Sequence, residues 1–371
     1  MAISKDGPLS SEREAQKLAF LAAAGLADTE RRPLPGDAST RSYERLIRPG
    51  KPSLMLMNSP PAAEGVTLGA DASETERTDA GYAAMARLCA SRVDAFVAAA
   101  RFLTSLGLSA PEIVAFDVAA GFALLEDLGD GLFVRRIEAG DDEAALYQGA
   151  VEALAFLQEI RPPAVLDAGG AAWPLLTYDD LALKTGADLF IQWLPKLEPR
   201  VTFDAAAHAE WDDLWRPVRQ RAEAGASVFA HRDYHAENLL WLPERTGVAR
   251  VGMIDFQDCV LAHPSWDLHS LLQDARRDVP PALEAAMLDH YFSLRPGIDR
   301  EAFMADYAAL AALNEARIIG IFSRLISRDG KPRYRAFLPR MWRHLMTSLA
   351  HPDLADVRAF VTARVPEDIR S

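Results

Sequence analysis

The stretch 231–238 constrains the fold of this chain more than any other part of the sequence. It reads His-Arg-Asp, then four residues, then Asn, so that a carboxylate and a carboxamide stand at a fixed spacing. An apolar run at 239–242 follows, then a turn at 243–247 and a second apolar run that ends at Asp255. Apolar runs separated by Pro and Gly predict a β-hairpin. The sequence therefore predicts two acids and an amide at one end of a hairpin.

These residue types suit the transfer of a phosphoryl group from ATP to a hydroxyl. Such a reaction needs one carboxylate to orient the hydroxyl and accept its proton, and a second carboxylate with an amide oxygen to hold Mg²⁺. Asp233 suits the first task, and Asn238 and Asp255 suit the second. The alternative, a capped surface turn with ordinary acids, fits the strand–turn–Asp order less well.

Length and charge limit the other classes of function. The chain has 371 residues, enough for two lobes with a core each. Its net charge is −13, and the sequence contains no cluster of Lys and Arg that would form a basic face. Nucleic acids and anionic membranes both require a basic face, so neither is expected as a partner. ATP must be held by local cations and Mg²⁺.

Cysteine usage and hydropathy favour a cytoplasmic protein. The two cysteines, Cys89 and Cys259, are far apart and lack a C-x-x-C spacing, so disulfide and zinc frameworks are not expected. The N-terminus lacks the apolar core of a signal peptide, and no stretch is long enough to span a bilayer.

The first third of the chain has the pattern of an antiparallel sheet with flanking helices. Ser11 and Glu14 have the spacing of a capping box, which predicts a helix that begins there and ends near Gly25. Short extended runs at 43–47 and 53–57 flank one turn, and runs at 111–118 and 122–128 flank another. Between these two hairpins, apolar residues at helical spacing predict a helix over 93–106.

Nucleotide contacts are expected from two places in this lobe. The small, polar loop 36–40 and the residue after it offer Ser39, Thr40 and Arg41 to the phosphates. Considered without the motif at 231–238, the loop fits a plain hairpin turn better. The strand at 53–58 lacks the lysine that kinases use to bind phosphate. Lys51 precedes that strand, and Arg41 or Arg45 from the neighbouring strand are alternatives that the sequence leaves open.

A change from strand to helix character near residue 128 marks the lobe boundary. We predict an N-lobe over 1–128, with an exposed insertion at about 59–92, and a C-lobe over 129–371. Glu126 and Leu128 lie where a hinge would offer backbone groups to adenine; a simple linker is the alternative. Amphipathic patterns then predict helices over 142–160, 177–194, 204–223, 280–293, 300–328 and 333–349. Another helix is expected to begin with a cap at Ser265.

Six stretches resemble the aminoglycoside phosphotransferase and choline kinase-like superfamily, and within it the bacterial anomeric kinases of N-acetylmuramate and N-acetylglucosamine that serve cell-wall recycling. The resemblance covers nearly the whole chain. The stretches that carry it are 36–43, 56–61, 124–129, 231–258, 320–325 and 328–332.

The resemblance implies an α+β, bilobal, protein-kinase-like fold with a small sheet-bearing N-lobe and a larger helical C-lobe. Asp233 would be the catalytic base, Asn238 and Asp255 the Mg²⁺ ligands, and Asp267 the acid that braces the catalytic loop from behind. His231 is interpreted as scaffolding of the loop. The chain reads Asp-Phe-Gln where protein kinases read Asp-Phe-Gly, and Asp267 follows too soon for an activation segment. A small-molecule kinase fits this better than a kinase of proteins.

The implied reaction is ATP-dependent phosphorylation of the anomeric hydroxyl of N-acetylmuramate or N-acetylglucosamine, without an obligate protein partner. Candidates for sugar contacts are Asp188, Trp193, Arg317 and Arg324, although a core aromatic explains Trp193 and ion-paired faces explain the arginines. Two further hypotheses are an aminoglycoside kinase, which an acidic pocket would favour, and a pseudokinase, which the missing lysine suggests.

Overall fold

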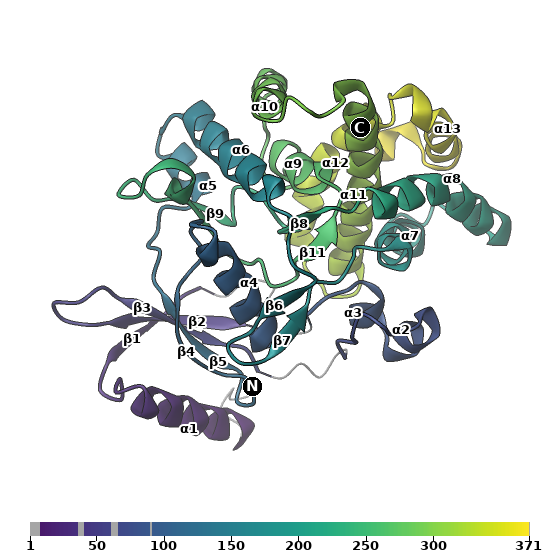
Figure 1. Ribbon diagram of the computed structural model, residues 1–371. Coiled ribbons are helices and arrows are strands. Elements are labelled where there is room, and N and C mark those ends of the chain that lie inside the picture. The colour runs from purple at the N-terminus through teal and green to yellow at the C-terminus, as the bar shows by residue number, and fades with distance from the viewer. Residues whose placement is uncertain (1–7, 36–40, 61–65, 90, 371) are drawn as a thin grey trace.

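The protein has a sheet-bearing lobe beside a larger helical lobe (Figure 1). The computed structural model describes residues 8–35, 41–60, 66–89 and 91–370. The five-stranded sheet lies in its N-terminal third and helices make up most of the remainder, so the predicted α+β, bilobal fold is confirmed. Within the described residues, no helix is long and apolar enough to cross a membrane.

Five antiparallel strands form the sheet of the N-terminal lobe, in the order β1-β2-β3-β5-β4. Both predicted hairpins are confirmed. The turn before β5 requires a glycine, because Gly121 has a φ of +72° and a Cβ there would lie 2.2 Å from the carbonyl oxygen of Ser59. The strands are β1 (Glu30–Pro33), β2 (Ser42–Ile47), β3 (Leu54–Asn58), β4 (Ile113–Asp117) and β5 (Phe122–Glu126).

Successive side chains of β3 and β5 point to opposite faces of the sheet, and both faces are apolar. Leu56 and Leu124 pack in the cluster that includes Leu21 of α1 (Pro8–Ala23), whereas Met57 and Leu125 belong to the cluster that contains most of α4 (Val93–Ser105). The helix predicted over 93–106 is confirmed. The predicted start of the first helix is wrong: α1 already begins at Pro8, so Ser11 lies inside it.

The segment predicted to be an exposed insertion is not exposed throughout. It contains α2 (Glu74–Ala80) and α3 (Tyr82–Met85), and Arg77 of α2 is only 3% exposed. The Arg77 guanidinium binds both carboxylate oxygens of Asp179, at 2.5 and 2.9 Å, and Arg87 binds the same carboxylate at 2.9 Å. Asp179 also caps α7 (Asp180–Leu197). The insertion is therefore tied to the C-terminal lobe.

The C-terminal lobe is built mainly from helices, and the predicted long helices are confirmed to within a few residues. The expected cap at Ser265 is wrong, because Ser265 is the first residue of α9 and Pro264 occupies the cap position. Helix α13 and the short β6–β7 hairpin (Val165–Asp167, Ala172–Pro174) were not predicted. The helices are α5 (Phe133–Glu138), α6 (Glu143–Glu159), α7 (Asp180–Leu197), α8 (Ala205–Ala224), α9 (Ser265–Leu272), α10 (Pro281–Leu294), α11 (Arg300–Ser327), α12 (Leu338–Ser348) and α13 (Ala355–Arg364).

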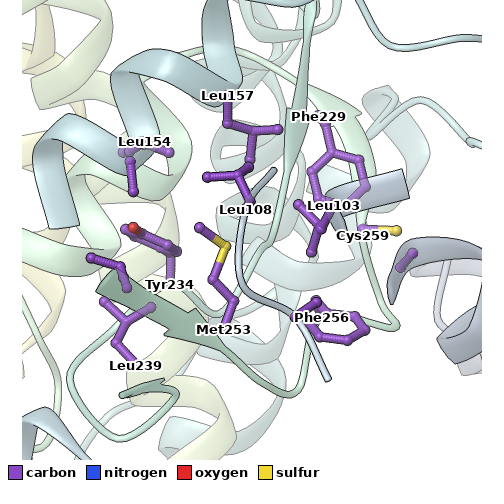
Figure 2. Packing of buried hydrophobic residues seen from close by; sticks show 14 of the residues in the cluster. Leu103, Leu108, Leu154, Leu157, Phe229, Tyr234, Leu239, Met253, Phe256 and Cys259 are labelled. Carbon is purple, nitrogen blue, oxygen red and sulfur yellow. The ribbon is translucent and has the colours of Figure 1, made fainter. Parts of the chain in front are cut away.

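One apolar cluster joins the two lobes beneath the predicted catalytic stretch. Figure 2 shows Tyr234, Leu239, Met253 and Phe256 from this stretch and its hairpin packed with Leu103 of α4 and with leucines of α6. All these side chains are fully buried. These buried contacts fix the backbone of the catalytic stretch, and with it the polar residues that lie between its apolar ones.

Candidate functional site

Two short antiparallel ladders bring the three predicted catalytic residues together. Strand β9 (Leu239–Trp241) pairs with β10 (Val251–Met253), which confirms the predicted hairpin, and β8 (Val228–Ala230) pairs with β11 (Val260–Ala262). The loop from β8 to β9 carries Asp233 and Asn238, and the loop from β10 to β11 carries Asp255. The N–H of Ile254 donates to the carbonyl oxygen of Asn238 at 3.0 Å, which joins the two loops directly.

Asp267 of α9 holds the first of these loops from behind. Its carboxylate accepts the backbone N–H groups of His231 at 2.6 Å and Arg232 at 2.8 Å. Burial raises the pKa of Asp267 to about 7, against the lowering effect of these two hydrogen bonds. The His231 ring is also buried, and this lowers its pKa to about 4. Its Nε2 donates to the carbonyl oxygen of Ile254 at 2.9 Å, so the neutral ring bridges the two loops.

Arg232 connects the catalytic loop to the insertion. It adopts a φ of +81°, and its buried guanidinium donates to the carbonyl oxygens of Ala86 at 2.9 Å and Arg87 at 3.2 Å. The same guanidinium lies 4.6 Å from the centre of the Tyr178 ring. The sequence analysis assigned no role to Arg232, since no local pattern indicates that its partners come from the insertion.

Asp233 is placed in a cationic environment. Burial alone would raise its pKa, but the charges of Arg317, His235 and Arg232 together outweigh this effect and lower it. The carboxylate is thus ionised at neutral pH and can accept a hydrogen bond from a hydroxyl. That is the state a base needs when it mainly orients the attacking group.

Asn238 and Asp255 present oxygen atoms beside Asp233. The Asn238 Nδ2 donates to the Asp233 carbonyl oxygen at 2.9 Å, which leaves Oδ1 as the atom for a ligand. Asp255 has a φ of +65°, and 48% of its side chain is exposed. Partial desolvation and the charge of Asp233 raise the pKa of Asp255, while Gln257 donates to its Oδ1 at 3.0 Å. A cation at this point would relieve the repulsion between the two carboxylates.

The donor set fits Mg²⁺. Mg²⁺ is usually held by one or two protein oxygens and completes its shell with water and phosphate oxygens. Over the part of the chain that the structure describes, no group of three or more His, Cys, Asp and Glu side chains is placed to hold a metal ion. The Asp255 carboxylate and the Asn238 carboxamide oxygen would supply the two protein ligands of such a Mg²⁺ ion, and a bound nucleotide would supply others.

Of the cations left open by the sequence, Arg41 lies at the site. Its Nη1 is 3.4 Å from the Asp255 carboxylate, and its Nη2 is 3.5 Å from the sulfur of Cys89. Arg45 points elsewhere, because it pairs with Asp127 and Asp130, each at 2.7 Å. Ser39 and Thr40 lie outside the described residues.

The predicted hinge residues lie at the end of β5. The backbone N–H of Glu126 donates to the carbonyl oxygen of Glu112 at 2.8 Å, and its carboxylate pairs with Arg245 of the turn between β9 and β10. Leu128 lies beside Gly252 of β10. Both residues therefore stand where the sheet meets the catalytic hairpin, and their contact with adenine stays a prediction.

A pocket with a volume of about 100 Å³ opens beside Asp233. Of the four predicted sugar-binding residues, only Arg317 lines it. No sequence pattern pointed to Ser270, Gln273 or Arg276 in its wall, because only the fold brings α9 and the segment after it to the catalytic loop. The lining residues are Arg232, Asp233, His235, Ser270, Gln273, Ala275, Arg276, Asn314, Arg317, Ile318, Ile321 and Phe322.

The other three candidates are engaged away from this pocket. Asp188 pairs with Lys184 at 2.9 Å, and Lys184 pairs in turn with Asp212 of α8. Arg324 lies over the rings of Tyr82 and Trp193, at 5.2 and 6.0 Å from their centres. These contacts stabilise the packing of α7 on its neighbours. The spacing of Asn314, Arg317 and Ile321 on one face of α11 is a signal that the sequence did contain.

Comparison with known proteins agrees with this geometry. Residues 30–313 match the family model described as "Phosphotransferase enzyme family". The chain is 57% identical to the N-acetylmuramate/N-acetylglucosamine kinase of Caulobacter vibrioides, over 98% of this chain and 99% of that protein.

Solved structures share the fold at low sequence identity. A choline/ethanolamine kinase family protein from Mesorhizobium loti has a TM-score of 0.55 at 18% identity and covers 96% of this chain and 99% of its own. An amicoumacin kinase in complex with AMP-PNP, Ca²⁺ and Ami has a TM-score of 0.56 at 15% identity, over 92% and 97%. From the site geometry and these matches together, we conclude that the chain belongs to the phosphotransferase enzyme family and is a kinase.

Proposed function

We propose that this protein uses ATP to phosphorylate the anomeric hydroxyl of N-acetylmuramate, N-acetylglucosamine or both, and that the sugar 1-phosphate is the product. The observation that carries the proposal is the 57% identity to the Caulobacter vibrioides kinase over 98% of this chain. A product of this kind would return amino sugars released from the cell wall to biosynthesis.

Each residue of the site would perform a separate part of this reaction. Asp233 would orient the anomeric hydroxyl and accept its proton; because that hydroxyl is more acidic than an ordinary alcohol, a single ionised carboxylate is sufficient. Asn238 Oδ1 and Asp255 would hold Mg²⁺, and Arg41 would bind the phosphates where other kinases use a lysine. Bound Mg²⁺ would neutralise the charge on the phosphates.

The pocket favours a sugar over an aminoglycoside as the acceptor. Its walls combine amides and a hydroxyl, from Gln273, Asn314 and Ser270, with an apolar side at Ile321 and Phe322. Amides and hydroxyls pair well with sugar hydroxyls and with an acetamido group. Aminoglycosides are polycations, and Arg317, which donates to the neutral Asn314 side chain, would repel them.

The pseudokinase hypothesis receives no support from the geometry of the site. Its motive was the absent lysine, and the partly buried Arg41 guanidinium beside Asp255 would take the place of that lysine. The base, the amide and the second carboxylate are also grouped together on the two linked loops.

A substrate panel tests the proposal. The protein is incubated with ATP and Mg²⁺, and ADP release is measured with N-acetylmuramate, N-acetylglucosamine, kanamycin and choline. We expect turnover of at least one acetylated sugar, with a product that releases phosphate under mild acid as a 1-phosphate does. Turnover of kanamycin alone would show that the protein is an aminoglycoside kinase. Nucleotide binding without turnover of any substrate would show that it is a pseudokinase.

Asp233→Asn tests the assignment of the base. The carboxamide keeps the shape of the side chain but cannot accept the proton, so kcat should fall by about 100- to 10,000-fold. AMP-PNP binding, measured by calorimetry, should stay within about threefold of the wild type. Activity close to normal would remove Asp233 from this role.

A further inference from the structure

Three arginines line the acceptor pocket. Arg232 donates to backbone carbonyl oxygens, and Arg276 and Arg317 differ in the charges beside them. Arg276 is neutralised locally, because its Nε pairs with the Glu237 carboxylate at 3.0 Å and its Nη1 donates to His235 Nε2 at 2.8 Å. Arg317 donates through Nη1 to the neutral Oδ1 of Asn314 at 2.9 Å. Across the described ranges, Arg317 has no ion pair with a carboxylate, and its charge therefore remains available to a ligand.

The surroundings of Arg317 strengthen and orient this charge. Ile318, Ile321 and Phe322 supply an apolar wall beside it, and in such a wall a charge interacts more strongly than in water. Gly186 of α7 fits against its stem, since a Cβ at that position would lie 3.0 Å from Arg317 Cδ. The side chain is thus held in one direction, toward the space that Asp233 also faces.

Arg317 and Asp233 line the same pocket but do not pair directly. Both side chains belong to its wall, and among the described residues they form no ion pair with each other. A substrate group bound by Arg317 must therefore lie near the reacting hydroxyl but not on it. On a hexosamine, a substituent on O3 meets this condition, because C2 separates C3 from the anomeric carbon.

We propose that Arg317 binds the carboxylate of the lactyl ether that N-acetylmuramate carries on O3 and that N-acetylglucosamine lacks. This inference rests on the proposed function and assigns the residue that distinguishes its two sugars. A guanidinium presents paired N–H donors that match the two oxygens of a carboxylate. N-acetylglucosamine would fill the same pocket and leave Arg317 to water and Asn314.

Kinetics of Arg317→Met on the two sugars test this assignment. For N-acetylmuramate, kcat/KM should fall by about 10- to 100-fold, mostly through a higher KM, because a charge-assisted contact is lost. For N-acetylglucosamine, kcat/KM should fall less than for N-acetylmuramate, because only the effect of the lost charge on Asp233 remains. Arg317→Lys should fall between the wild type and Arg317→Met. Arg300→Met is the matched control, since Arg300 lies at the opposite end of α11 and pairs with Asp289 at the surface.

A modified substrate isolates the carboxylate without changing the protein. The wild-type enzyme should turn over the lactyl carboxamide of N-acetylmuramate with the same 10- to 100-fold loss, about the range of a charged hydrogen bond, and Arg317→Met should treat acid and amide alike. Equal wild-type rates on acid and amide would overturn the proposal, even if the variant failed to fold. Equal losses on both sugars would also overturn it and would place Arg317 at the phosphoryl group. Inactivity of the wild type on both sugars would instead refute the proposed function, and this inference with it.

Discussion

Replacing Arg77 by Met should destabilise the protein, because this arginine anchors the insertion to the helical lobe. Arg77 is 3% exposed, and its guanidinium binds both oxygens of Asp179 at 2.5 and 2.9 Å. It also donates to the carbonyl oxygens of Ala84 at 3.3 Å and Met85 at 2.7 Å. Methionine fills part of the volume but replaces none of these hydrogen bonds.

The expected cost follows from what the lost guanidinium leaves behind. Removing one partner of a buried ion pair costs about 3–5 kcal/mol when the remaining charge is left without compensation. Asp179 keeps two contacts with Arg87, at 2.9 and 3.2 Å, and the N–H of Ala182 at 3.0 Å, so it is not left alone. The loss should therefore lie at or below the lower limit of that range, at about 2–3 kcal/mol of unfolding free energy.

The same change should reduce catalysis through Arg232. The Arg232 guanidinium donates to the carbonyl oxygens of Ala86 and Arg87, directly after the helix that Arg77 holds. If this segment moves, Arg232 and with it Asp233 lose their fixed position. We expect kcat to fall about 10-fold, which is less than the roughly 100-fold cost of a 1 Å misplacement.

Urea denaturation followed by tryptophan fluorescence measures the loss of stability, and ADP release measures kcat. Arg135→Met is the matched control, because the Arg135 side chain is 72% exposed and pairs with the exposed Glu138, an interaction worth about 0–1 kcal/mol. A double variant with Asp179→Asn should lose less than the sum of the two single changes. Stability of Arg77→Met equal to that of the control would refute the anchoring role.

Two further predictions concern the nucleotide site and pH. Arg41→Met should raise the KM for ATP by about 10-fold and leave the KM for the sugar unchanged, as a lost charged contact to phosphate would; an unchanged KM for ATP would exclude the role of Arg41. Burial lowers the pKa of His231 to about 4, so between about pH 4 and 6.5 the unfolded chain binds a proton that the folded chain does not. The unfolding free energy of the wild type relative to His231→Gln should therefore rise by about 3 kcal/mol over this range, and parallel pH profiles in urea denaturation would contradict this.

Local sequence patterns were sufficient for the parts of the protein in which neighbours along the chain are also neighbours in space. Turn residues between apolar runs predicted both hairpins of the sheet and the catalytic hairpin, since strand pairing across a short turn depends on local chemistry. The spacing of Asp233, Asn238 and Asp255 predicted a phosphotransferase for the same reason. The roles of these three residues stay predictions until the variants are measured.

Only the tertiary structure determines which distant residues contact the catalytic loop and its hairpin. Arg77 and Asp179 are 102 positions apart, and nothing in either neighbourhood indicates the other, so the insertion was predicted to be exposed. The sequence did not distinguish Arg41 from Arg45 as the phosphate-binding cation. In the fold, Arg41 lies beside Asp255, whereas Arg45 pairs with Asp127 near the predicted hinge. Among the four candidate sugar contacts, only Arg317 reaches the pocket, because the packing of α11 against α7 determines which face of α11 lines it. The sequence by itself thus determined the chemistry of the loop, whereas the packing of separate helices determined the shape and charge of the space in front of it.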